Sequence, residues 1–403
     1  MNKFLMSACA VLIGLSACNQ QKDIKMGSYA YDAKFLKDHG INYVELKSAD
    51  GSSKVMIVPS WQGRVVTTSA AGDEGDSYGW INYRFIEAGE QSNQFNPVGG
   101  EERFWLGPEG GPYSLYFENG KEQVYENWKV PAVIDTEAYD VTEVNDTSIQ
   151  FKKNTAVTNA SGTKFEIAID RTVNLLSKSA VENRLGVKLP AEAKLVAYES
   201  LNKITNIGKE PWTKDKGLVS IWMLSHFNPT PTTTVFIPYN ESAEGKIVND
   251  EYFGKIPAER LKTDNGMIYF KIDGKLRSKL GVPPARAKGL CCSYDSEKNV
   301  LTILRCNVPE KPQTYLNGQW GKQDDPFAGD MLNAYNDGPV EDGSIMGPFY
   351  EIETSSPGAE LDVNGSILHK QEIFHIQADE NILNPIVNTL FGVDLETIKS
   401  QFR

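Results

Sequence analysis

Short runs in which hydrophobic and polar residues alternate make up much of the chain, and turn residues separate them. Residues 164–170 alternate almost without exception, as expected of a strand that turns one face to solvent. Further strand-like runs lie at 147–152, 195–204, 218–224, 233–237, 267–272, 290–294, 300–306, 349–354 and 372–377. Many short strands with few long helical patterns predict an all-β fold, in which large antiparallel sheets pack as a sandwich.

The two ends of this region carry short helical patterns. Residues 32–39 form a helix candidate that Gly40 stops, and Asp394 is an N-cap candidate for a short helix within 384–402. After the first helix, residues 42–46 and 54–58 flank a turn and predict a β-hairpin, with a third strand at 63–68. We therefore expect one β-sandwich domain over residues 41–380 and a helical tail over 381–403.

The first residues have the pattern of a bacterial lipoprotein signal. Lys3 precedes an apolar run at residues 4–15, which is too short to span a bilayer and ends in the lipobox sequence Leu-Ser-Ala-Cys at 15–18. This pattern predicts a signal peptide at 1–17, a lipid on Cys18 and a tether with a short helix at 18–40. An ordinary cleaved signal is the alternative. The prediction places the protein in the cell envelope, held to the outer membrane only by lipid, on its periplasmic side or at the cell surface.

Composition and charge narrow the partners. The chain has 403 residues, of which 40% are hydrophobic and 10% aromatic, enough to bury a core. Its formal net charge of −12 argues against nucleic acid and is compatible with a neutral ligand such as a sugar. Beyond the lipobox the sequence has three cysteines, Cys291, Cys292 and Cys306. Two alternatives remain for them: a disulfide between Cys306 and one of the other two, or three buried thiols.

Two strand ends carry candidate catalytic residues. His226 stands where a strand pattern gives way to polar and proline residues, a position typical of site residues, and Asn228 follows as a candidate for substrate binding. Glu351 and Glu353 share one face of a late strand, which Ser355 and Pro357 follow. Partial burial would raise the pKa of such a carboxyl toward the range of a general base. A structural histidine and a solvent-facing acidic row are the plainer alternatives.

The segment 99–113 combines glycines, aromatic residues, an arginine and acidic residues. Arg103, Trp105 and Glu109 in this segment are candidates for substrate binding, because sugars are bound by aromatic faces and by polar groups that take the hydroxyls. The segment has no phosphate-loop pattern. A tight structural loop around a buried tryptophan is the alternative.

Three segments occur in the same order as in the galactose mutarotase (aldose 1-epimerase) superfamily, which the chain resembles. Residues 44–69 resemble the opening hairpin, residues 204–212 the segment that leads to a histidine, here His226, and residues 353–359 the late strand end that begins with Glu353. Within this superfamily the chain most resembles an uncharacterised lipoprotein family of Bacteroides-type bacteria. The resemblance implies a β-supersandwich that binds a sugar in a shallow cleft on one sheet.

The resemblance also implies chemistry at the anomeric centre. In that superfamily a glutamate removes the proton of the anomeric hydroxyl and a histidine protonates the ring oxygen, so that the ring opens and closes on its other face. Carried over, Glu353 is the base and His226 the acid. A second histidine that the superfamily carries in an early loop is missing from residues 99–113.

Three functions follow as hypotheses. The leading one is a mutarotase-type enzyme that acts on carbohydrate without a cofactor; the others are a carbohydrate-binding lipoprotein of a glycan-uptake system and a glycoside-cleaving enzyme that uses Glu109 with Glu353. We assign no metal, because the loop oxygens of Asp324, Asp325 and Asp337 are more typical of turns than of a calcium site. The oligomeric state stays open.

Overall fold

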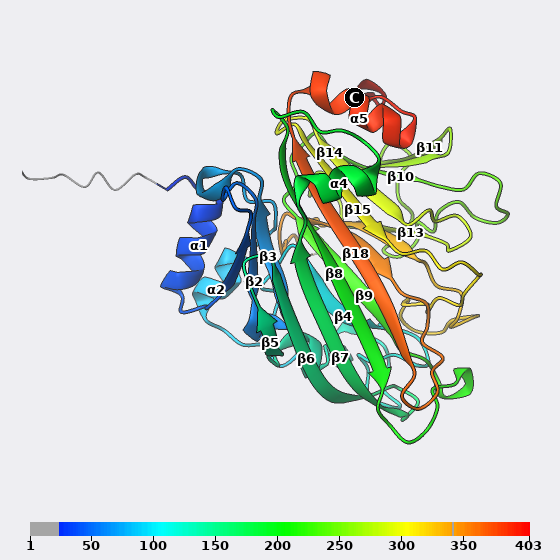
Figure 1. Cartoon of the computed structure of the whole chain (residues 1–403). Coiled ribbons are helices and arrows are strands. Elements are labelled where there is room, and N and C mark those ends of the chain that lie inside the picture. The colour runs from blue at the N-terminus through cyan, green and yellow to red at the C-terminus, as the bar shows by residue number, and fades with distance from the viewer. Residues whose placement is uncertain (1–23, 341) are drawn as a thin grey trace, which may run out of the picture.

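The computed structural model describes residues 24–340 and 342–403. The predicted signal peptide and Cys18, the residue predicted to carry a lipid, lie outside the described residues. Within the described part, no helix combines the length and the apolar character needed to cross a bilayer. Two large antiparallel sheets face each other, with helices at one side and at the top of the view (Figure 1).

The larger sheet has ten strands, and all their pairings are antiparallel. In spatial order they are β11 (Leu261–Asp264), β12 (Met267–Lys271), β10 (Thr233–Pro238), β14 (Leu290–Asp295), β15 (Val300–Cys306), β18 (Ser366–Gln377), β8 (Lys194–Asn206), β7 (Lys164–Leu175), β6 (Ser148–Thr158) and β5 (Asp140–Val144). The alternation at 164–170 is seen in β7, where Phe165, Ile167 and Ile169 are buried while the residues between them are not.

The second sheet has five strands and carries the candidate site. In spatial order they are β13 (Ser278–Val282), β16 (Leu332–Asn336), β17 (Tyr350–Ser355), β9 (Ser220–Phe227) and β4 (Arg103–Gly107). A third sheet consists of β1 (Val44–Lys47), β2 (Lys54–Val58) and β3 (Arg64–Ser69), which confirms the predicted hairpin and third strand. The all-β prediction is confirmed.

Three apolar clusters hold these layers together. The largest includes residues from the facing sides of the two large sheets, such as Ile169 from β7 and Ile352 from β17. A second packs the helices α4 (Lys178–Leu185), α5 (Glu380–Phe391) and α6 (Leu395–Ser400) on the ten-stranded sheet. A third packs α1 (Tyr29–Asp38) and α2 (Tyr83–Ala88) on the three-stranded sheet. The short helix α3 (Ala132–Asp135) contacts β4.

Some local predictions are confirmed and others are incomplete. Asp394 caps α6, because its carboxylate accepts a hydrogen bond from the Thr397 amide at 2.8 Å. Cys291, Cys292 and Cys306 are buried free thiols, so the open disulfide is not formed. The alternation pattern missed β4, because all five of its residues are buried and none marks a solvent face. The strands β5, β11, β13 and β16 and the helices α2, α3 and α4 were also missed.

Candidate functional site

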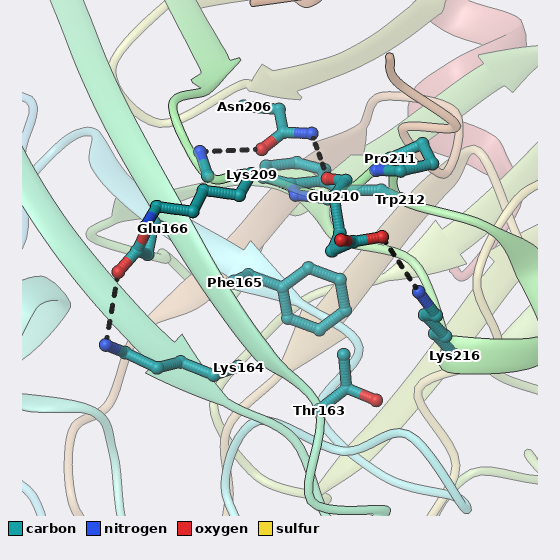
Figure 2. Close-up of a pocket in the computed structure, with 11 residues that line it drawn as sticks. Thr163, Lys164, Phe165, Glu166, Asn206, Lys209, Glu210, Pro211, Trp212 and Lys216 are labelled. Atoms are coloured by element: carbon teal, nitrogen blue, oxygen red, sulfur yellow. Dashed lines mark hydrogen bonds and ion pairs between the residues drawn. The ribbon is translucent and has the colours of Figure 1, made fainter. Parts of the chain in front are cut away.

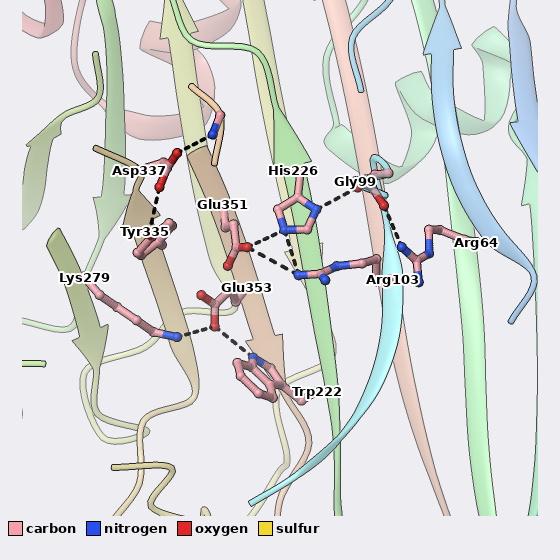
Figure 3. A network of polar contacts seen from close by, with 12 residues as sticks. Arg64, Gly99, Arg103, Trp222, His226, Lys279, Tyr335, Asp337, Glu351 and Glu353 are labelled. Carbon is pink, nitrogen blue, oxygen red and sulfur yellow. Dashed lines mark hydrogen bonds and ion pairs between the residues drawn. The ribbon is translucent and has the colours of Figure 1, made fainter. Parts of the chain in front are cut away.

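One face of the five-stranded sheet collects charged side chains from neighbouring strands. Cross-strand partners point to the same face of a sheet. The register Lys279–Tyr335–Glu351–His226 forms one row across β13, β16, β17 and β9. The next row brings Glu353 beside Leu224, which pairs with Arg103 on β4. The chain therefore gathers its two predicted catalytic residues and Arg103 on one face (Figure 3).

The Glu353 carboxyl lies at the centre of this face and is fully buried. Its Oε2 accepts hydrogen bonds from Lys279 Nζ at 2.9 Å and from Trp222 Nε1 at 2.8 Å. Its Oε1 is buried and has no hydrogen-bond donor among the described residues when Glu353 and Glu351 are both ionised. Burial raises the pKa of Glu353 to about 7, and the Glu351 carboxyl adds to this rise while Lys279 opposes it. Glu353 therefore exchanges its proton near neutral pH.

His226 is held beside Glu351 and Arg103. Its Nδ1 lies 3.1 Å from the Gly100 carbonyl oxygen, and its Nε2 lies 2.7 Å from Arg103 Nη2 and in close contact with Glu351 Oε1. Burial, and after it the Arg103 guanidinium, hold the pKa of His226 well below its usual value. The neutral ring then carries its proton on Nδ1, which donates to Gly100, and Nε2 accepts from Arg103. In this form Nε2 lies against Glu351 Oε1 without a proton between them, and a proton on Nε2 would make that contact a hydrogen bond.

Glu109 faces the same charges from the loop that follows β4. Burial raises its pKa to about 7, Glu353 adds to the rise, and Lys279 lowers it, as do the indole groups of Trp320 and Trp128. The Lys279 charge thus lowers the pKa of both Glu109 and Glu353. Two carboxyls whose pKa values are both near neutrality are typical of acid–base chemistry.

Two predicted binding residues, Trp105 and Asn228, are occupied by contacts with other protein groups. Trp105 is on the same face but only 3% exposed, with the Arg103 guanidinium 4.7 Å from its ring centroid and the Trp222 ring 5.6 Å away. Its ring faces are thus covered by protein groups. Asn228 follows β9, is exposed, and donates a hydrogen bond to the Gly79 carbonyl oxygen at 3.0 Å.

Sequence reasoning missed Lys279 and Trp222 as site residues. Lys279 lies 74 positions from Glu353 in the chain, and no pattern in the unrecognised strand β13 signals that they meet. Trp222 was within reach, because it stands on the same face of β9 as His226, four residues earlier. Glu351 was placed correctly on the face of Glu353, although no role was assigned to it.

The loop oxygens considered for calcium have partners in the protein. Asp337 accepts hydrogen bonds from Tyr335 Oη at 3.0 Å and from the Gly347 amide at 2.8 Å. Asp325 accepts one from the Phe327 amide at 2.8 Å, two residues on, as in an ordinary turn. Over residues 24–340 and 342–403, no three His, Cys, Asp or Glu side chains gather in a way that could hold a metal ion.

A separate cavity of about 360 Å³ lies at the start of β7, beside the segment that follows β8 (Figure 2). Its charged side chains lie beside each other at the surface, with Lys164 3.3 Å from Glu166 and Lys216 3.9 Å from Glu210. Trp212 is buried against Phe165 in an edge-to-face contact. This cavity lacks a buried ionisable group, so we place the candidate site at the carboxyls of the five-stranded sheet.

Comparison with known proteins identifies the family. The chain belongs to a family of unknown function, DUF6786, whose model matches residues 27–402. A comparison with curated proteins finds no match.

Solved structures similar to the chain include proteins of three bacteria. They are a protein from Synechocystis sp. PCC 6803 (TM-score 0.49, 12% identity, 84% of this chain and 96% of that chain covered), a galactose mutarotase related enzyme from Lactobacillus acidophilus (0.46, 8%, 83% and 97%) and a galactose mutarotase-like protein from Lactobacillus casei (0.43, 12%, 83% and 99%).

Proposed function

We propose that the protein acts on carbohydrate as a mutarotase-type enzyme, with its chemistry on the charged face of the five-stranded sheet. The observation that carries the proposal is the Glu353 carboxyl, which is fully buried, has one oxygen without a donor and has a pKa raised to about 7. A general base is most effective when its pKa lies near the working pH. The sugar hydroxyl would supply the donor that Oε1 lacks.

The proposed acid is His226 together with Glu351. A neutral imidazole whose Nδ1 donates to Gly100 has no proton on Nε2 to give. His226 therefore acts as the acid when its Nε2 carries a proton, which would lie against the Glu351 carboxylate, with Arg103 beside both groups. Glu353 takes the proton of the anomeric hydroxyl while this pair protonates the ring oxygen, so the ring opens with no net change of charge on the sugar.

The test is anomer interconversion, followed by polarimetry or by nuclear magnetic resonance over a panel of aldoses. We expect the purified protein to accelerate interconversion of at least one aldose and Glu353→Gln to lower that rate about 10²- to 10⁴-fold, the usual contribution of a general base. His226→Ala should lower it as well, while binding of the same aldose by Glu353→Gln stays close to that of the wild type. No acceleration with any aldose, or full activity of Glu353→Gln, contradicts the proposal.

A glycoside-cleaving enzyme is the second candidate, favoured by the coupled pKa values of Glu109 and Glu353. Such enzymes use two carboxyls on opposite sides of one bond. Release of reducing sugar from a glycan, lost in both Glu109→Gln and Glu353→Gln, would favour this candidate over mutarotation. A mutarotase requires Glu353 for anomer interconversion but releases no sugar from a glycan.

A further inference from the structure

A continuous set of aromatic rings leads from the Glu353 carboxyl to the protein surface. Trp222, which donates to Glu353, lies 5.6 Å from Trp105, and Trp105 lies 5.6 Å from Phe95. Phe95 in turn lies 5.6 Å from Trp128. Each of these contacts is edge-to-face, the arrangement that aromatic pairs prefer, so the set is packed as a wall rather than as scattered rings.

The wall ends in two exposed rings. Trp320 and Tyr125 both stack on Trp128, each with a centroid distance of 6.1 Å. Trp320 is 37% exposed and Tyr125 is 63% exposed, whereas Trp128 between them is 8% exposed. Large aromatic rings that remain open to solvent beside an acidic group, here Glu109, are typical of ligand contacts rather than of core packing.

The loops that carry these rings are fixed in place. The Gln123 side chain accepts hydrogen bonds from the Gly111 amide at 2.9 Å and from the Gly321 amide at 2.7 Å, and it donates to the Gly111 carbonyl oxygen at 2.7 Å. A Cβ atom at Gly110 would come within 2.2 Å of the Gln319 carbonyl oxygen, so the two loops touch through their backbones. Trp320 is thereby held next to Glu109, whose carboxyl its indole group influences.

From this placement we infer that the exposed rings of Trp320 and Tyr125 form a second sugar subsite, which continues the site of Glu353 past Glu109. The substrate class is then a glycan of at least two sugar units rather than a free monosaccharide. One unit places its anomeric centre at Glu353, and the next packs the C–H face of its ring on Trp320 or Tyr125. This inference rests on the proposed function for the position of the first unit.

The test compares binding of one glycan and of its own terminal monosaccharide. Calorimetry on the full chain measures free reducing glycans in solution and the monosaccharide at the reducing end of each, with glucose, cellobiose, maltose, galactose and lactose as a fixed panel. We expect a disaccharide or longer glycan to bind more tightly than its monosaccharide. Trp320→Ala should weaken glycan binding on the order of tenfold, and Tyr125→Ala by less, while monosaccharide binding stays unchanged.

Phe253→Ala is the matched control. Phe253 is 46% exposed and contacts Tyr335, 5.8 Å away, near the opposite edge of the five-stranded sheet. Equal binding of glycan and monosaccharide, no glycan bound, or a loss with Phe253→Ala instead of Trp320→Ala overturns the subsite. Glycan binding that depends on Trp320 without any turnover overturns the proposed mutarotase and leaves the subsite standing. Turnover that Trp320→Ala leaves unchanged, together with equal binding of glycan and monosaccharide, overturns the subsite and leaves the proposed mutarotase standing.

Discussion

Two glutamates are fully buried on the two sides of the five-stranded sheet, and their surroundings differ. Glu102 lies between the two large sheets, where its Oε1 is 2.6 Å from Arg171 Nη2. Its Oε2 accepts hydrogen bonds from Ser200 at 3.0 Å and from Gln371 at 2.7 Å. Every oxygen of this carboxylate is therefore occupied, and its charge is balanced by one cation.

Glu353 on the outer face is held less completely. Lys279 and Trp222 bind one of its oxygens, and the other has no donor among the described residues in the ionised state. A second carboxyl, Glu351, lies two residues away on the same strand face and raises the pKa of Glu353. A buried carboxylate such as Glu102, whose hydrogen bonds and counter-ion are all present, stabilises the fold. A buried carboxylate such as Glu353, which lacks one hydrogen bond and has a like charge beside it, is stabilised when it binds a ligand or a proton.

The largest difference should appear in stability when each carboxylate becomes an amide. Glu102→Gln leaves the Arg171 guanidinium buried without a counter-ion, so we expect it to lower the free energy of unfolding by about 3–5 kcal/mol. Glu353→Gln also takes a carboxylate from Lys279, but it leaves Glu351 and Glu109 near that ammonium, keeps an acceptor for Trp222 and removes the repulsion from Glu351, so we expect a loss under about 1 kcal/mol. Urea unfolding of both variants at pH 7, followed by circular dichroism, measures the two values. Equal losses would show that both carboxylates serve the fold alike.

The next difference lies in the response of stability to pH. The folded state raises the pKa of Glu353 from 4.5 to about 7, so it binds a proton that the unfolded chain releases. The stability contributed by this proton is present below pH 4.5 and is lost as the pH rises to about 7, in total roughly 3 kcal/mol. Glu109 acts in the same direction, while the buried His369, whose pKa burial lowers to about 3, destabilises the fold as the pH falls below 6.5.

The contribution of Glu353 is isolated by comparing two unfolding curves. The difference in free energy of unfolding between the wild type and Glu353→Gln should fall steadily from pH 4.5 to 7 and stay level above it. Both curves are measured in a Glu109→Gln background, because Glu353 raises the pKa of Glu109 and the Glu109 slope would not cancel. His369 is present in both proteins, so to first order its slope cancels. A constant difference across this range would mean that Glu353 is ionised throughout and does not exchange a proton near neutrality.

The strands that the sequence patterns missed are all four or five residues long, and they differ in burial, from β4, which is buried throughout, to β5, which is exposed throughout. The run at 164–170 predicted β7 because buried and accessible residues alternate there, but β4 is buried on both faces and gives no alternation. His226 and Glu353 were singled out at strand ends, a resemblance then gave them predicted roles, and the two-residue period placed Glu351 beside Glu353. Lys279 was beyond reach, because only the order β13–β16–β17 brings it to a carboxyl 74 positions away.

The smallest expected effect comes from this lysine, and it tests how Glu353 is tuned. The Lys279 ammonium, 2.9 Å from Glu353 Oε2, lowers the pKa of that carboxyl against the larger effect of burial. Removing the charge with Lys279→Met should therefore raise the pKa of Glu353 by about one to three units, because opposite charges at this distance shift pKa values by that amount. The acidic limb of kcat/KM, expected near pH 7 in the wild type, should move upward by the same amount. Lys279→Arg keeps the charge and should keep the limb. Carbon-13 titration of the Glu353 carboxyl measures the same shift without any substrate; an unmoved carboxyl would mean that burial and Glu351 alone set its pKa, and that Lys279 serves the fold as Arg171 does.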